Sequence, residues 1–285
     1  MQSHRTTMRE PAATRRVTRA GLALIAIGAT IGACARNPHP ILHSTAWVRT
    51  APEYDAVARE AFRLAMDRLP EALEHPFWTA AIEQTGGYQE LPPAVIVDID
   101  ETVLDNTPFQ VRMINEGEEF DAEAWAAWVE EAAALPVPGA LDFARAAERR
   151  GIEIFYVTNR DQPQEAATRR NLQAAGFPLG ASGQDRVLSR GERREWTSDK
   201  SSRRAAVARR YRILLLIGDD LNDFVSARLS PAERDSLAAR YEDRWGRQWI
   251  MIPNPLYGSW EDALYGFQSG VSPDEKTRRK ADALD

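Results

Sequence analysis

The sequence predicts an α/β protein with a doubly wound, mostly parallel sheet of the Rossmann type and a small helical cap or side domain. Strands alternate with helices along the chain, and three strongly apolar strands end in polar side chains. Continuous apolar strands suit the interior of a parallel sheet that is covered on both faces, and ligands of such sheets bind outside the carboxyl ends of the strands. We therefore expect a site at this edge of the sheet.

The first of these strands covers residues 94–97 and ends at Asp98 and Asp100. With the period-two alternation of a strand, the two carboxylates point the same way. Like charges at this distance repel each other unless a cation lies between them, so the spacing favours a metal site. The alternative is a strand followed by an acidic turn, which is more typical of a single Asp.

Apolar periodicity and glycines define the remaining elements. Helices are expected where apolar residues recur every three or four positions, and several of them end at a glycine. The expected helices cover residues 53–73, a short segment through 78–82, 107–134, 141–150, 164–175 and 201–211. The other expected strands cover 152–157, 185–188, 212–217 and 249–252. Two of these end at Thr158 and at Asp219, Asp220 and Asp223, and Lys200 precedes the last helix.

An aromatic stripe runs through the expected helical region 107–134 and includes Phe109, Phe120, Trp125 and Trp128. Stripes at helical spacing usually belong to a hydrophobic core. Here the stripe falls between the first acidic strand and the next helix, where a cap over the site would be inserted. The sequence leaves open whether these side chains face the core or a ligand.

Composition and charge exclude several classes of protein. The chain has 285 residues, of which 44% are hydrophobic and 27% charged, enough for a large core with an added cap. Its formal charge is −6, and residues 1–33 hold five arginines against one acid, so a nucleic-acid-binding protein is not expected. The single cysteine, Cys34, excludes an intrachain disulfide and a cysteine metal cluster.

The amino-terminal region has the features of an export signal. Three arginines precede an apolar run of fourteen residues, 20–33, which is too short to span a bilayer. The run ends at Cys34 in a pattern that resembles the bacterial lipoprotein signal, in which the cysteine is lipidated and becomes the first residue. This resemblance implies membrane attachment through Cys34, and Ala35 in place of an Asp favours the outer membrane. A cleaved secretory signal with an incidental cysteine is the alternative.

The polar strand ends suit phosphoryl transfer, in which one carboxylate attacks phosphorus, a second acid protonates the leaving oxygen and cations neutralise the phosphoryl oxygens. At roughly 4 Å and an effective dielectric near 20, each pair of negative charges costs about 4 kcal/mol. A carboxylate therefore cannot approach a phosphate dianion unaided. Magnesium together with a lysine would remove most of that cost.

Four motifs together resemble those of the haloacid dehalogenase superfamily. They are residues 98–106, 157–160, Lys200 and 218–224. Within the superfamily they are most similar to the class C bacterial acid phosphatases, the lipoprotein e (P4) family of outer-membrane 5′-nucleotidases. The likeness extends from about residue 47 to residue 267 and includes the lipid signal.

The resemblance implies a role for each motif residue. Asp98 would be the nucleophile that forms an aspartyl-phosphate, and Asp100 the general acid and later base. Thr158 would bind a phosphoryl oxygen, and Lys200 would neutralise the nucleophile and the phosphate. Asn159, in the same motif as Thr158, would contact the substrate.

The same resemblance implies a magnesium site and a nucleotide site. Mg²⁺ would be held by Asp98, the backbone carbonyl of Asp100, Asp219 and, through the metal's water shell, Asp223. Trp125 matches the family's stacking tryptophan, and Tyr257 matches a second aromatic wall. Trp260 stands where the family has a tyrosine, so the base preference stays open.

We therefore expect a magnesium-dependent acid phosphatase that hydrolyses phosphomonoesters, chiefly nucleoside 5′-monophosphates, and that could form a homodimer. A phosphotransferase on the same scaffold and a non-catalytic surface binding lipoprotein are the alternatives; a pure binder would have no need of the nucleophile. The expected organisation is a signal peptide at 1–33, a tether at 34–50, a helical segment at 51–93, a phosphatase core at 94–271 with a helical cap around 107–135, and a polar, frayed tail at 272–285.

Overall fold

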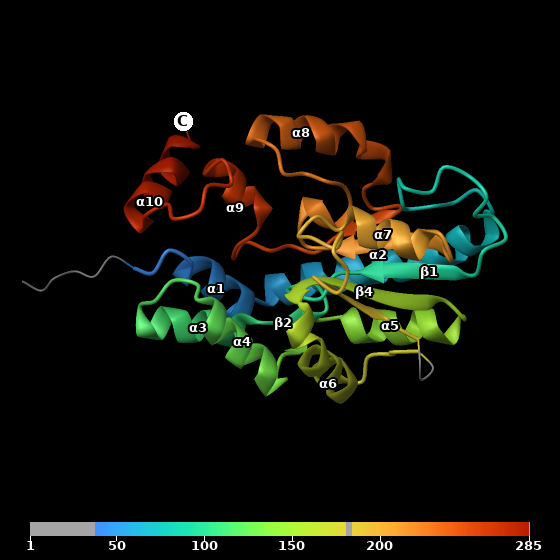
Figure 1. The fold of residues 1–285 in the computed structure, drawn as a ribbon, viewed down its shortest axis with the longest axis horizontal. Helices are drawn as coiled ribbons and strands as arrows, with labels where there is room; N and C mark the ends of the chain where they lie inside the picture. The colour runs from blue at the N-terminus through green and yellow to red at the C-terminus, as the bar shows by residue number, and fades with distance from the viewer. Residues whose placement is uncertain (1–37, 181–183, 285) are drawn as a thin grey trace, which may run out of the picture. The chain divides into compact units, whose positions relative to one another are not determined.

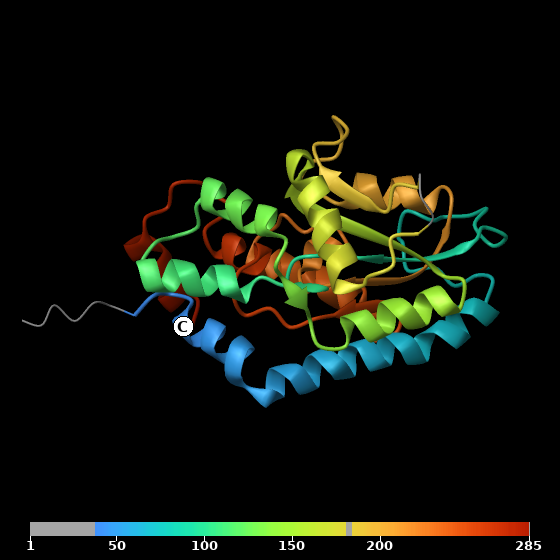
Figure 2. The ribbon, with the colours of Figure 1, turned by 90° about the horizontal axis from the view of Figure 1, so that it is seen from below.

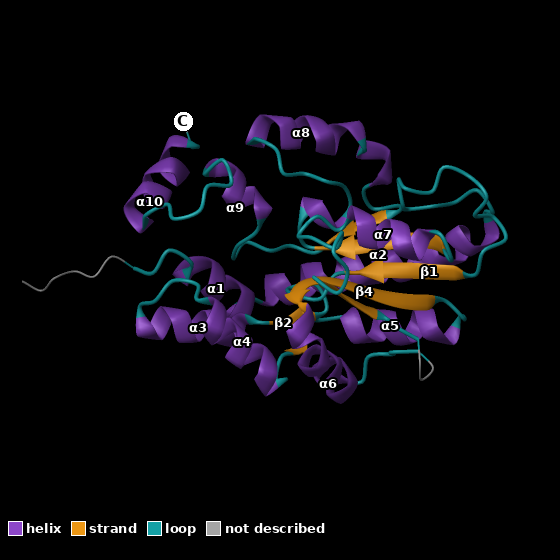
Figure 3. Ribbon diagram, viewed as in Figure 1, coloured by secondary structure: helices purple, strands orange, loops and turns teal. Residues whose placement is uncertain are grey.

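A five-stranded parallel sheet lies at the centre of the computed structural model, which describes residues 38–180 and 184–284. The strand order is β5-β4-β1-β6-β7, and every neighbouring pair is parallel. The strands are β1 (Pro93–Val97), β4 (Glu153–Asp161), β5 (Val187–Arg190), β6 (Arg212–Gly218) and β7 (Trp249–Met251). The predicted α/β class with a mostly parallel sheet is confirmed (Figures 1 and 3).

Helices cover both faces of this sheet. The chain forms α1 (Leu42–Thr50), α2 (Pro52–Glu74), α3 (Thr107–Glu116), α4 (Ala122–Glu131), α5 (Ala140–Arg149), α6 (Glu165–Ala175), α7 (Ser201–Ala208), α8 (Pro231–Arg240), α9 (Ser259–Leu264) and α10 (Pro273–Asp282). Figure 1 shows α7 on one face and α5 with α6 on the other, and Figure 2 shows α2 alongside α5. No helix of the described ranges is both long enough and apolar enough to cross a membrane.

The central strand β1 is apolar throughout because it is buried on both faces. Val95 and Val97 belong to the cluster that includes α2 and α5, whereas Ala94 and Ile96 belong to the cluster that includes α7. Alternating side chains of one strand thus fill two separate layers of core. This arrangement explains why the strand has no polar alternation in the sequence.

The region expected to form a cap contains α3 and α4. Two short strands, β2 (Leu104–Asp105) and β3 (Leu135–Pro136), pair in antiparallel fashion at its base. The inserted segment therefore leaves the core and returns to it at the same place, directly after the acidic turn that follows β1.

Three expectations about the flanking segments need correction. Residues 42–50, assigned to a tether, form α1, in which Val48 is buried and Trp47 packs edge-on against Tyr54. The helix expected through 78–82 is absent because this segment runs beside β6 instead, where the indole nitrogen of Trp78 donates to the carbonyl of Leu214 at 2.7 Å. The tail forms α10, capped by the Ser272 side chain. The export signal and Cys34 lie outside the described residues and stay predictions.

Candidate active site

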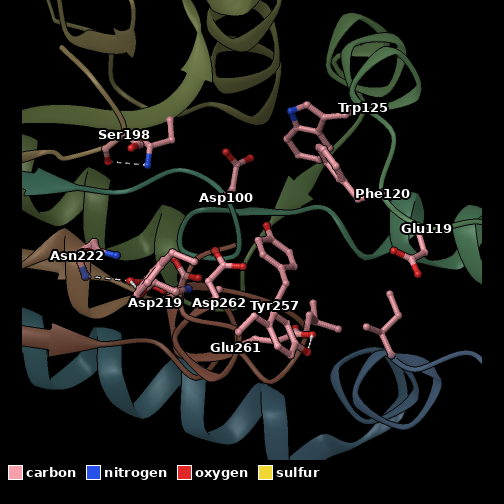
Figure 4. Close-up of a pocket in the computed structure, with 18 of the residues that line it drawn as sticks. Asp100, Glu119, Phe120, Trp125, Ser198, Asp219, Asn222, Tyr257, Glu261 and Asp262 are labelled. Carbon is pink, nitrogen blue, oxygen red and sulfur yellow. Dashed lines mark hydrogen bonds between the residues drawn. The ribbon is translucent and has the colours of Figure 1, made fainter. Parts of the chain in front are cut away.

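The acidic residues lie at the carboxyl edge of the sheet, as the parallel topology requires. Asp98 follows β1 and its backbone N–H donates to the carbonyl of Ile217 on the neighbouring strand at 2.9 Å. Thr158 lies in β4, and Asp219 follows β6. Asp98 and Asp219 line a cavity of about 940 Å³, whereas Thr158 is buried beneath it and is not among the lining residues. In Figure 4, Asp100 enters this cavity from one side, and Asp219 and Tyr257 face it from the other.

Three carboxylates converge at the base of the cavity. Asp98, Asp219 and Asp223 each offer an oxygen within 4.8 Å of the others. Asp223 reaches this position because the strand ends at a glycine: a Cβ on Gly218 would lie only 2.2 Å from the Asp223 carboxylate. A larger residue at position 218 would therefore displace one member of the cluster.

The electrostatics of this cluster show that it needs positive charge. Burial, followed by the charges of Asp98 and Asp223, raises the pKa of Asp219 well above its ordinary value. Burial likewise raises the pKa of Asp223 to about 7, although Lys200 acts in the opposite direction. Three carboxylate oxygens at this spacing fit a hard divalent cation such as Mg²⁺, which prefers oxygen ligands. The carboxylates of Asp98, Asp219 and Asp223, which the sequence assigned to the metal site, thus lie together, and the contact assigned to the backbone carbonyl of Asp100 stays a prediction.

Lys200 supplies one positive charge to the cluster from within the protein. It is the residue that precedes α7, and its ammonium group donates to Asp98 and, at 2.5 Å, to Asp223. Burial opposes its charge, but the carboxylates of Asp223 and Asp98 more than compensate and raise the pKa of Lys200 above its ordinary value. The Lys200 side chain therefore carries a positive charge at neutral and acidic pH.

Asp100 occupies a separate environment from Asp98. Its Oδ1 accepts hydrogen bonds from the Arg160 guanidinium, through Nη2 at 2.7 Å and Nε at 2.9 Å, and from Asn106 Nδ2 at 2.9 Å. Among the described residues, its Oδ2 accepts only from Thr158 Oγ1, at 3.3 Å. Thr158 is fully buried and is directed at Asp100 in this structure, so its predicted contact with a phosphoryl oxygen stays a prediction.

Asp219 is fixed by two polar neighbours that the sequence did not single out. Thr102 Oγ1 donates to one carboxylate oxygen at 2.9 Å, and Asn254 Nδ2 donates to the other at 2.7 Å. Asn254 follows β7, so a fourth strand end contributes to the site. Its position directly after an apolar strand was the signal that could have identified it.

The aromatic stripe divides between the core and the cavity. Trp128 is buried, and its indole nitrogen donates to Asn106 Oδ1 at 2.9 Å, so it is a core residue. Trp125 and Phe120 line the cavity, together with Tyr257 from the opposite wall (Figure 4). Trp128 therefore belongs to the core, whereas contact of Trp125 and Phe120 with a ligand stays a prediction.

Two further predicted substrate-binding residues have different outcomes. Asn159 lines the cavity and is held by Ser198, whose carbonyl accepts its amide at 3.0 Å. Trp260 is not among the residues that line the cavity; it is 40% exposed, and its indole nitrogen donates to the carbonyl of Tyr257 at 3.3 Å. The expectation that Trp260 belongs to the aromatic wall of the substrate site is not met. Its side chain lies in the first turn of α9 and is exposed to solvent.

Glu101 is a buried site residue that the sequence analysis missed. It has a left-handed backbone with φ of 59°, and its carboxylate accepts from the backbone N–H of Asn106 at 2.9 Å and from the Tyr257 hydroxyl. Burial, reinforced by the charge of Asp100, raises the pKa of Glu101. Its place immediately after Asp100 was visible, but its partner Tyr257 is distant in the sequence.

The carboxyl-terminal segment borders the outer part of the cavity. Lys276 of α10 pairs with Glu119 at 2.8 Å, and Lys280 pairs with Glu261 at 2.7 Å. All four residues line the cavity. The tail predicted to be a frayed end is therefore part of the rim.

Comparison with known proteins agrees with this geometry. Residues 43–260 match the family model of the HAD superfamily, subfamily IIIB acid phosphatases. Because the match covers well over half of the sequence, the chain belongs to this family.

Solved structures and a curated relative show the same likeness. The class C acid phosphatase of Bacillus anthracis has 31% sequence identity and a TM-score of 0.75, with 86% of this chain and 96% of that chain covered. The structure of the Bacillus anthracis class C acid phosphatase with tungstate bound has 30% sequence identity and a TM-score of 0.74, again with 86% of this chain and 96% of that chain covered. Acid phosphatase 1 of Solanum lycopersicum is 30% identical over 166 residues, so the match spans 57% of this chain and 57% of the length of that relative.

The buried pairing of Lys200 predicts a large loss of stability when it is removed. Lys200→Met leaves Asp98 and Asp223 as uncompensated buried charges, which typically costs roughly 3–5 kcal/mol. We expect the free energy of unfolding of the metal-free protein to fall by that amount in denaturant titrations. Lys276→Met is the matched control: its pair with Glu119 is 35% and 46% exposed, so a change below about 1 kcal/mol is expected. Equal losses in the two variants would contradict this account.

Proposed function

We propose that this protein is a magnesium-dependent phosphatase that hydrolyses phosphomonoesters through an aspartyl-phosphate on Asp98. The observation that carries the proposal is the cluster of Asp98, Asp219 and Asp223, paired with Lys200 at the floor of a cavity of about 940 Å³. Membership in the acid phosphatase family supports it. So does the tungstate complex of the Bacillus anthracis relative, because tungstate is an oxyanion like phosphate.

The first half of the proposed reaction transfers the phosphoryl group to the protein. A carboxylate oxygen of Asp98 forms a bond to phosphorus while the bond from phosphorus to the ester oxygen breaks. Asp100 donates a proton to that ester oxygen, which leaves as an alcohol. Lys200 keeps Asp98 oriented and offsets the repulsion between the carboxylate and the phosphate.

The second half returns the protein to its starting state. Asp100, now ionised, accepts a proton from a water molecule whose oxygen attacks phosphorus, and the bond between phosphorus and Asp98 breaks to release phosphate. The cation that Asp98, Asp219 and Asp223 would hold supplies further charge neutralisation at the phosphoryl oxygens. A phosphotransferase would differ only in using an alcohol in place of water, and no contact among the described residues of the site favours that alternative.

We propose nucleoside monophosphates as the substrate class, and the aromatic lining of the cavity supports this proposal. Trp125 and Phe120 on one wall and Tyr257 on the other present aromatic surfaces to the same space. Purine and pyrimidine rings stack on such surfaces without needing a base-specific hydrogen bond. The phosphoryl group would then reach the carboxylates while the base occupies the outer part of the cavity.

The nucleophile assignment predicts that Asp98→Asn abolishes turnover without unfolding the protein. The amide preserves the volume of the side chain but has no anionic oxygen to attack phosphorus. We expect the rate with an aryl phosphate to fall below a few per cent of wild type while the circular dichroism spectrum is unchanged. Higher residual activity in a folded variant would remove Asp98 from this role.

Two controls accompany this variant. Asp161→Asn alters an exposed carboxylate at the end of β4 that pairs with Arg190 at 2.7 Å, and it should retain most of the activity. The wild-type protein should lose activity after chelation and regain it with Mg²⁺. Unchanged activity after exhaustive chelation would contradict the proposed metal dependence while leaving the nucleophile assignment open to its own test.

The aromatic wall predicts a selective effect on nucleotides. Stacking of a base on an aromatic side chain contributes roughly 1–3 kcal/mol, which corresponds to about a five- to 150-fold change. Trp125→Ala should therefore lower kcat/KM for nucleoside monophosphates by an amount in that range and leave glycerol phosphate nearly unaffected. Trp260→Ala is the matched control and should not alter the ratio between these substrates. Equal losses on all substrates would show that Trp125 serves packing only.

We also propose that the protein is exported and attached to the outer membrane through a lipidated Cys34. The basis is the arginine-led apolar run and the signal pattern that ends at this cysteine. Mass spectrometry of the mature protein from membranes should find Cys34 as the acylated first residue. A mature chain that begins elsewhere, or an unmodified Cys34, would make it a soluble exported enzyme instead.

A further inference from the structure

We propose that Arg160 is a positioning residue that clamps Oδ1 of Asp100 and so assigns the catalytic proton to Oδ2. This inference rests on the proposed role of Asp100 as general acid and base. The Arg160 side chain is only 1% exposed, and the residue is among those that line the cavity. Its Nη2 and Nε both donate to the same oxygen, Asp100 Oδ1, at 2.7 and 2.9 Å.

Asn106 completes the clamp on that oxygen. Its Nδ2 donates to Asp100 Oδ1 at 2.9 Å, so three N–H groups converge on one carboxylate oxygen. A carboxylate oxygen has two lone pairs, and here no direction is left for a proton. Within the described residues, Oδ2 has a single long partner, the Thr158 hydroxyl at 3.3 Å, which can rotate to accept rather than donate. The proton therefore sits on Oδ2 when Asp100 acts as an acid.

The guanidinium is itself held, so the clamp is rigid. Its Nη1 donates to Thr168 Oγ1 on α6 at 3.2 Å, and its Nη2 also approaches Asn106 Oδ1 at 3.2 Å. The backbone N–H of Arg160 donates to Thr158 Oγ1 at 3.0 Å, which ties the arginine to the other partner of Asp100. A carboxylate gripped in this way keeps one orientation while its second oxygen gains and loses a proton.

The clamp also reaches the wall where the leaving group would lie. The Arg160 guanidinium carbon is 5.5 Å from the centre of the Trp125 ring, within the range of a cation–π contact. Asn106 Oδ1 accepts a hydrogen bond at 2.9 Å from the indole nitrogen of Trp128, which lies in α4 together with Trp125. The residues that orient the acid are therefore connected to the helix that would contact the group receiving its proton.

A lysine at this position could not do the same work. The planar guanidinium presents several donors in a fixed fork, whereas an ammonium group is a compact charge on a flexible stem. The Arg160→Lys variant would keep the positive charge, but its single ammonium nitrogen could not replace the two nitrogen donors to Oδ1 while also bonding Thr168. This substitution thus separates the geometry of the clamp from its charge.

The test varies the leaving group. Poor leaving groups, such as alkyl alcohols, depend on protonation by Asp100, whereas 4-nitrophenolate departs with little help. For Arg160→Lys we expect kcat/KM with glycerol phosphate to fall by about 10- to 100-fold, the scale of a misplaced catalytic group, and with 4-nitrophenyl phosphate by much less. A series of aryl phosphates should show a steeper dependence on the leaving-group pKa than wild type. An equal loss on every substrate would overturn the proposal.

Arg204→Lys is the matched control for a buried arginine near the site. Arg204 is fully buried and donates to the carbonyls of Asn222 and Asp223 at 3.1 and 3.2 Å, without contacting Asp100. Any loss in this variant should be the same for all leaving groups. In Arg160→Ala, added guanidinium should restore turnover of glycerol phosphate while methylammonium should not, since only the former reproduces the fork. Restoration by both cations would mean that charge alone matters.

A second variant and a double variant keep the inference testable if Arg160→Lys folds poorly. Asn106→Ser removes one of the three donors to Oδ1 and should steepen the leaving-group dependence in the same direction, by a smaller factor. Asp100→Asn sets the upper limit of the effect, and adding Arg160→Lys to it should change little further. An unchanged leaving-group dependence in Asp100→Asn would contradict the acid role of Asp100. A changed dependence in Asp100→Asn with no change in the Arg160 and Asn106 variants would contradict only the positioning role of Arg160.

Discussion

Repulsion among clustered carboxylates is the constraint on which this site depends. Asp98 and Asp223 are buried, Asp219 is partly buried, and each offers an oxygen within 4.8 Å of the others, so each like pair would cost about 4 kcal/mol without compensation. Lys200 offsets part of this charge from the beginning of α7. The remaining negative charge favours a cation, so the repulsion that costs stability would also contribute to metal binding.

The parallel sheet makes this concentration of charge possible. Strands β1, β4 and β6 are direct neighbours, so the residues that follow their carboxyl ends meet without long loops. Asp98 and Asp219 follow their strands immediately in the sequence, and Thr158 follows the apolar part of β4, so their place at this edge of the sheet was predictable from the pattern alone. Because neighbouring parallel strands end at the same edge of the sheet, residues at the ends of different strands lie close together in space.

Other parts of the site were not predictable from local pattern because their partners are distant in the chain. The role of Glu101 depends on Tyr257, which lies 156 residues away. The segment after α2 carries helical periodicity, yet it bonds to β6, and tertiary contacts override propensity there. Helix α10 has no buried residue, so no apolar pattern in its sequence predicts where it packs. Ion pairs such as Lys276 with Glu119 place it at the rim of the cavity.

In the proposed mechanism, the two carboxylates of the first motif have two different chemical roles, and their surroundings differ accordingly. Asp98 and Asp100 are two residues apart, but Asp98 faces an ammonium group and two further acids, whereas Asp100 faces a guanidinium and an amide. An ammonium group can follow a carboxylate as it moves toward phosphorus, because its donors rotate freely. A guanidinium fork fixes a carboxylate in one orientation, which suits a group that must only exchange a proton. A lysine beside Asp98 and an arginine beside Asp100 therefore match the nucleophile and acid roles that we propose for these two carboxylates.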